Sequence, residues 1–159
     1  MPSPIAQLSR RAIARAASAI GVALLLACRS VPPCVTPTLE ALTIRWGEQD
    51  SLGLDVRGYE LRTTGELFAY RASGDSLRER VRIGRLDAQL YCTLLQQTLQ
   101  AFRQVPAFHV PAAQQRFVEY VLPPVTRKRA VWNPRYRTHG NEPLWELYEQ
   151  LERARTAQR

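Results

Sequence analysis

Two histidines and a nearby glutamate are the residues of this sequence whose types first suggest catalysis. His109 lies in a segment without clear periodicity, and His139 stands three residues before Glu142. A histidine close to a carboxylate can act as a general acid or base. However, no local motif supplies a nucleophile with its base and acid, and two separate histidines do not give the three or four ligands of a zinc site. We therefore predict no catalytic residue, no metal site and no cofactor.

A basic and aromatic stretch, TRKRAVWNPRYR, spans residues 126–137. Its candidate binding residues are Arg127, Lys128, Arg129, Trp132, Arg135, Tyr136 and Arg137. Such mixtures are typical of surfaces that bind anions. In a strand, however, alternate side chains point to opposite faces, so Arg127 and Arg129 would be separated from Lys128, and Trp132 could belong to the core. We favour a solvated, structural role for this stretch over a single binding patch.

An apolar run near the N-terminus precedes the elements that position these residues. Residues 1–15 contain three arginines and no acid, and residues 16–27, AASAIGVALLLA, are apolar or small. As a helix, this run would be about 18 Å long, which is shorter than the ~30 Å hydrocarbon core of a bilayer. This order of charge and hydrophobicity is typical of a secretory signal peptide and not of a permanent transmembrane helix.

The end of the apolar run resembles the lipobox of bacterial lipoprotein precursors. Leu25, Ala27 and Cys28 match that pattern, and Leu26 fills a position more often taken by a small residue. The resemblance covers residues 1–28 only. It implies that the Cys28 thiol receives diacylglycerol and that a signal peptidase recognises Leu25, Leu26 and Ala27 and cuts before Cys28. It also implies the outer membrane in a Gram-negative host, because Arg29 is not the aspartate linked to inner-membrane retention.

The basic start of the chain resembles a second kind of export signal. Residues 9–15, SRRAIAR, are similar to a twin-arginine signal, with Ile13 where Phe is usual and Arg15 where Lys is usual. A general export signal that happens to begin with arginines explains the same residues. Both export routes therefore stay open.

Two cysteines, Cys34 and Cys92, remain once Cys28 is assigned to the lipid. An oxidising envelope permits a disulfide between them, which would fix the tether to the first helix. Their spacing is not that of a C-x-x-C redox motif. Cys92 also follows Tyr91 on an apolar helix stripe, so a small buried side chain is the alternative. The sequence leaves both interpretations open.

The chain after residue 27 divides into a tether and one globular domain. Residues 28–38 contain three prolines, which predicts an extended tether, and residues 39–156 are long enough for one domain. Alternation and turn signals predict strands at 42–46, 56–63, 66–71, 80–86, 116–122 and 127–132. Helical spacing predicts one helix from an Asp87 cap to just before Pro106, and a second that starts at Asn141 or Glu142.

The short connections between consecutive strands favour antiparallel pairing. We therefore expect an α+β fold, in which two helices pack on an antiparallel sheet of about six short strands. The expected element order is ββββαββα.

The anchor and the lack of a catalytic spacing favour a non-enzymatic binding or interaction module in the cell envelope. The expected partners are the membrane, through the lipid, and an envelope protein or an anionic envelope polymer. Removal of residues 1–27 lowers the net charge from +8 to +5, which still favours anionic surfaces. We expect no nucleic acid partner, because an exported lipoprotein rarely meets one. The alternative is a small envelope enzyme or enzyme inhibitor that uses His139, Glu142 and nearby arginines, and an enzyme would need these side chains to line a pocket.

Overall fold

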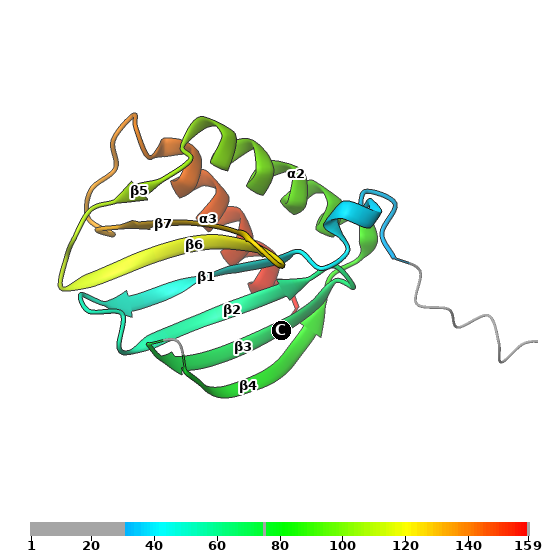
Figure 1. Cartoon of the computed structure of the whole chain (residues 1–159), viewed down its shortest axis with the longest axis horizontal. Helices are drawn as coiled ribbons and strands as arrows, with labels where there is room; N and C mark the ends of the chain where they lie inside the picture. The colour runs from blue at the N-terminus through cyan, green and yellow to red at the C-terminus, as the bar shows by residue number, and fades with distance from the viewer. Residues whose placement is uncertain (1–30, 75, 159) are drawn as a thin grey trace, which may run out of the picture. The chain divides into compact units, whose positions relative to one another are not determined.

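The computed structural model describes residues 31–74 and 76–158 of the chain (Figure 1). This part contains a sheet whose strands are β1 (Thr43–Asp50), β2 (Val56–Arg62), β3 (Glu66–Ser73), β4 (Ser76–Arg85), β5 (Phe108–His109), β6 (Gln114–Leu122) and β7 (Thr126–Trp132). Its helices are η1 (Pro37–Leu39), a short 3-10 turn, and the α-helices α2 (Ala88–Gln104) and α3 (Glu142–Thr156).

The strands form one sheet in the order β4-β3-β2-β1-β6-β7-β5. Neighbouring strands are antiparallel, except that β5 runs parallel to β7. The first strand, β1, therefore lies in the middle of the sheet, between β2 and β6. As a result, side chains of β1 meet residues from both halves of the domain.

The predicted α+β class with two helices on a mostly antiparallel sheet is confirmed, but the sheet has seven strands and not about six. The strand that was missed, β5, has only two residues, which is too short to show an alternating pattern. The first strand is also longer than expected, because residues 47–50, which have the composition of a loop, continue it. Gly47 pairs with Gly58 on one side and Phe117 on the other.

The two long helices begin where their sequence patterns predict, although the Asn141 side chain makes no capping bond to α3. The Asp87 carboxylate accepts a hydrogen bond from the Leu90 amide at 2.8 Å and so caps α2. The buried stripe of α2 consists of Tyr91, Leu94, Leu95, Thr98, Ala101 and Phe102. The buried stripe of α3 consists of Leu144, Leu147, Tyr148, Leu151 and Ala154. These stripes direct both helices to the sheet.

The main core lies between the helices and one face of the sheet. Ile44, Trp46, Val118 and Trp132 extend from this face and are almost completely buried. Residues Val31–Arg159 form one compact unit with this core inside it, so we expect this part to fold without the preceding residues. Within the described residues, no helix covers the opposite face of the sheet, which we call the open face.

A disulfide between Cys34 and Cys92 ties the segment before β1 to α2. The two Cα atoms are 5.6 Å apart, and 58 positions separate the residues in the sequence. Both half-buried side chains pack against the main core. Of the two interpretations that the sequence leaves open for Cys92, the structure therefore contains the disulfide.

Candidate functional site

The structure does not bring the seven basic and aromatic residues of the 126–137 stretch together. Arg127 and Arg129 lie on the open face, and strand alternation places Lys128 and the fully buried Trp132 on the face that carries the helices. The other three, Arg135, Tyr136 and Arg137, belong to the loop before α3. A single patch of these seven residues does not form, because the strand divides them between two faces.

The open face instead carries a set of arginines around two buried glutamates. Glu119, on β6, is 1% exposed and accepts a hydrogen bond from Arg129 at 2.6 Å. Two nitrogens of Arg127 contact the same carboxylate oxygen, each at 3.0 Å. Arg45 approaches the other oxygen of Glu119 at 3.7 Å. The central strand therefore contributes one cation to this carboxylate, and β7 contributes two.

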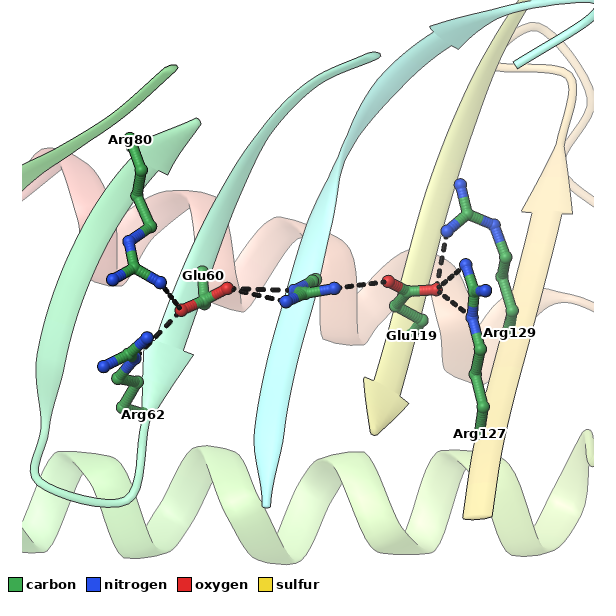
Figure 2. Close-up of polar contacts among 7 residues, drawn as sticks. Glu60, Arg62, Arg80, Glu119, Arg127 and Arg129 are labelled. Atoms are coloured by element: carbon green, nitrogen blue, oxygen red, sulfur yellow. Dashed lines mark hydrogen bonds and ion pairs between the residues drawn. The ribbon is translucent and has the colours of Figure 1, made fainter. Parts of the chain in front are cut away.

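Glu60, on β2, has the same kind of surroundings on the other side of β1. It is 3% exposed, and its carboxylate accepts hydrogen bonds from Arg45 at 3.0 Å, Arg62 at 2.9 Å and Arg80 at 3.3 Å. Arg45 thus bridges the two glutamates, and the ion pairs cross the sheet from β4 to β7 (Figure 2). We call these residues the arginine–glutamate network: Arg45, Arg62, Arg80, Arg127, Arg129, Glu60 and Glu119.

Strand register explains how residues so distant in sequence meet. Arg45 is directly opposite Glu60 on β2 and Glu119 on β6, and Glu119 is directly opposite Arg129 on β7. Side chains that are directly opposite each other on one face of an antiparallel pair lie close enough to interact. Alternation then places the remaining arginines of the network on the same face.

The network has an excess of positive charge at its solvent side. Five guanidinium groups surround two carboxylates, which leaves a net charge of +3. The glutamate side chains are only 2–4% exposed, whereas the arginine side chains are 25–53% exposed. The carboxylates therefore hold the guanidinium groups in place, and the remaining N–H donors are directed to solvent or to a ligand.

Aromatic rings below the arginines fix the guanidinium groups further. The Arg129 guanidinium carbon lies 4.3 Å from the centre of the Phe117 ring, and that of Arg45 lies 5.8 Å from the Tyr70 ring. Phe68 is contacted in the same way by two other arginines of the network. Such cation–π contacts are worth about 0.5–2 kcal/mol each, depending on burial. The cations are thus held in defined positions, which is the preorganisation that a binding site needs.

A groove of about 540 Å³ runs along the open face beside the network. Its walls include Arg45, Arg127 and Arg129, and Tyr70 lies at its floor. The Tyr70 ring packs against Gly58 so closely that a Cβ atom at position 58 would lie 2.9 Å from ring carbons. Glycine at this position therefore lets the tyrosine ring pack directly on the backbone of β2.

Burial, followed by the negative charge of Glu119, raises the pKa of Tyr70 to about 12, and burial raises the pKa of Tyr91 to about 12. Because these values exceed the ordinary pKa of about 10, the protonated phenols stabilise the fold fully below about pH 10. We expect this contribution, about 2–3 kcal/mol per tyrosine, to be lost as the pH rises from about 10 to 12. Urea unfolding midpoints should fall over this range, and Tyr70→Phe should flatten the fall. A midpoint that stays constant would contradict the prediction.

His139 and Glu142 lie close together but in an open position. The His139 Nδ1 atom is 3.8 Å from a Glu142 oxygen, and the His139 side chain is fully exposed. Both residues border a groove of about 410 Å³ between α2 and α3, and Glu142 also pairs with Arg137. His109 is an exposed residue of β5. The two residues that the enzyme alternative uses therefore line a groove, as that alternative requires, although the His139 side chain points into solvent.

Cys28 and the lipobox residues Leu25, Leu26 and Ala27 lie outside the described residues, as do the residues of the twin-arginine motif. Among the helices that the structure describes, none is both long and apolar enough to cross a membrane. In the same part of the chain, no group of three or more histidine, cysteine or acidic side chains is arranged to hold a metal ion.

Comparison with known proteins assigns no family. No family model matches the sequence, and no curated protein matches it either. The site must therefore be interpreted from its own geometry.

Proposed function

We propose that this chain is a lipid-anchored protein of the cell envelope and that it acts there as a non-enzymatic binding module. Its open face binds an anionic component of the envelope, and the lipid on Cys28 holds it to the membrane, which is the outer membrane in a Gram-negative host. A nucleic acid is not the partner, because the envelope rarely presents one.

The observation that carries the binding proposal is the imbalance of charge on the open face. The two carboxylates can neutralise only two guanidinium groups, but five arginines converge on them. An antiparallel sheet can keep one face in water with ordinary polar side chains. Fixed and partly exposed guanidinium groups next to a groove are instead suited to carboxylate, sulfate or phosphate ligands.

Two observations support the envelope location. The Cys34–Cys92 disulfide suits an oxidising compartment. The order of arginines, apolar run, Ala27 and Cys28 suits export followed by lipidation. Two or three acyl chains would make the anchor durable, since each buried CH₂ contributes about 0.8 kcal/mol.

Binding to dextran sulfate, compared with uncharged dextran, tests the binding proposal. The protein is the chain from position 28 onward with Cys28→Ser, which needs no detergent. We expect binding to dextran sulfate only, and weaker binding at high salt because exposed charges are screened. The double variant Arg127→Gln/Arg129→Gln should lose about tenfold or more in affinity.

Lys128→Gln is the matched control, because it removes a charge from the same strand on the opposite face. It should leave the affinity nearly unchanged. The control removes one charge and the double variant removes two, so a response to net charge alone would give the control half the loss of binding free energy, and that result would refute the open face as the site. In intact cells, a crosslinker at the groove should trap an envelope component, and charge reversal at Arg127 and Arg129 should weaken that capture.

A further inference from the structure

The groove on the open face has an apolar end in addition to its charged side. Leu52, in the loop after β1, and Leu77, near the start of β4, line it and are 76% and 57% exposed. Between them, Val56 and Ala72 line the same groove, and Val56 is buried in a small apolar cluster with Tyr70, Phe117 and Val131. Exposed leucines that border an apolar floor are typical of a binding surface.

The strand register gives the distance between the charged end and the apolar end of the groove. Arg45 and Glu60 form one cross-strand row of the open face, and Gln49, Val56 and Ala72 form another row four residues further along β1. At about 3.3 Å per residue, these rows are about 13 Å apart. Most of the guanidinium groups therefore lie at one end of a short path, Arg129 reaches from there to Gln49 in the second row, and the two exposed leucines lie at the other end.

The two carboxylates in the groove do not remove its preference for an anion. Glu60 and Glu119 also line the groove, but their oxygens are occupied by arginine donors. Gln49 is likewise occupied, because it accepts a short hydrogen bond from Arg129 and donates to Gln115 at 2.8 Å. The free hydrogen-bonding groups that remain at the charged end are mainly guanidinium N–H donors, which prefer an anion.

We infer that the groove binds an amphiphilic anion, that is, one molecule with a phosphate, sulfate or carboxylate head and a hydrocarbon portion. The head lies on Arg45, Arg127 and Arg129, and the hydrocarbon lies across Val56 between Leu52 and Leu77. This inference rests on the proposed function and specifies its ligand. A purely hydrophilic polyanion would use the arginines and leave the leucines in water, so the two ligand classes predict different effects of the leucines.

Decyl phosphate below its critical micelle concentration is the probe. It is compared with decyl maltoside, which has the same chain and no charge, and with inorganic phosphate, which has no chain. Calorimetry on the chain from position 28 onward with Cys28→Ser gives the affinities, and NMR of the arginine Nε–H groups locates the head. We expect decyl phosphate to bind at least tenfold more tightly than either comparison ligand, because both ends contribute.

The variants separate the two ends. Leu52→Ser/Leu77→Ser should weaken decyl phosphate binding about tenfold or more and leave dextran sulfate binding unchanged. These side chains are exposed, so the double variant should fold normally. Val125→Ser, which alters a residue that is 87% exposed and does not line the groove, is the control and should change nothing. Arg127→Gln/Arg129→Gln should weaken both ligands.

The outcomes distinguish this inference from the proposed function. If dextran sulfate binds through the arginines but decyl phosphate binds no better than inorganic phosphate, the amphiphile inference is overturned and the binding module stands. If neither anion binds, both the amphiphile inference and the proposed binding module are refuted. Vesicles of phosphatidylcholine with added phosphatidylglycerol then identify the source. Vesicle binding that depends on the two leucines indicates a bilayer lipid. Binding of the monomeric probe alone indicates a free amphiphile. Either result supports the inference.

Discussion

Replacing Cys28 by alanine should abolish the incorporation of a labelled fatty acid into this protein. The thiolate is the nucleophile that forms the thioether to diacylglycerol, and alanine has no atom that can replace it. The lipobox resemblance further implies that the signal peptidase cuts before the lipidated Cys28. The variant should therefore keep residues 1–27 and migrate as a larger chain than the wild type.

Ser30→Ala is a matched control for this experiment, because it alters a small polar residue two positions after the cysteine. It should be labelled and processed like the wild type. Label in the Cys28→Ala variant would place the lipid elsewhere and would remove the lipobox interpretation. Because Cys34 and Cys92 are joined in the disulfide, neither offers a free thiol as a substitute.

Loss of the disulfide should lower the free energy of unfolding by about 4 kcal/mol. The cross-link closes a loop between residues 58 positions apart, and the chain-entropy model gives about 4 kcal/mol for a loop of this length. For a domain of this size, the loss corresponds to a fall in Tm of roughly 15 °C. Differential scanning calorimetry of Cys92→Ala, compared with the wild type, measures it.

The matched variant Cys34→Ala should cost nearly the same, since either change opens the same loop. Treating the wild type with dithiothreitol should reproduce the fall, and treating either variant should add nothing. A wild-type Tm that does not change under reduction would mean that the bond does not form in the native protein. It would also remove one of the two supports for an oxidising compartment.

Helices were the most predictable part of this fold. Their apolar stripes need only local spacing, and Asp87 could be assigned as a cap because a short polar acceptor precedes the stripe. In α3, for example, the helically spaced leucines Leu144, Leu147 and Leu151 are all buried. Strand β5 could not be found in this way, because two residues carry no period.

The arginine–glutamate network was missed by the sequence analysis for a topological reason. Alternation along β1 assigns Arg45 to the face opposite Trp46, but it does not say which strands lie beside β1. The neighbour β6 comes about 70 residues later, and its Glu119 is the one charged residue of the segment 117–122 of that strand. A carboxylate in such a strand was the available signal, because a buried acid requires a partner. Identifying that partner required the order of the strands in the sheet.

The basic stretch shows how composition can mislead. Arg127 and Arg129 belong to the candidate site, but the residues that complete the site with them come from β1, β2, β4 and β6 and not from the rest of the stretch. Spatial clustering across strands, and not clustering along the chain, makes this surface positive. This is the expected behaviour of a sheet, in which sequence neighbours face opposite ways.

The intact mass of the native protein, purified from its own membranes, is the sharpest test of the lipid anchor on Cys28. We expect a chain that begins at Cys28, with the added mass of diacylglycerol on that residue and with Cys34 and Cys92 oxidised. A mass that includes residues 1–27 with an unmodified Cys28 would contradict it. That result would remove the assigned location and the reason for excluding a nucleic acid partner.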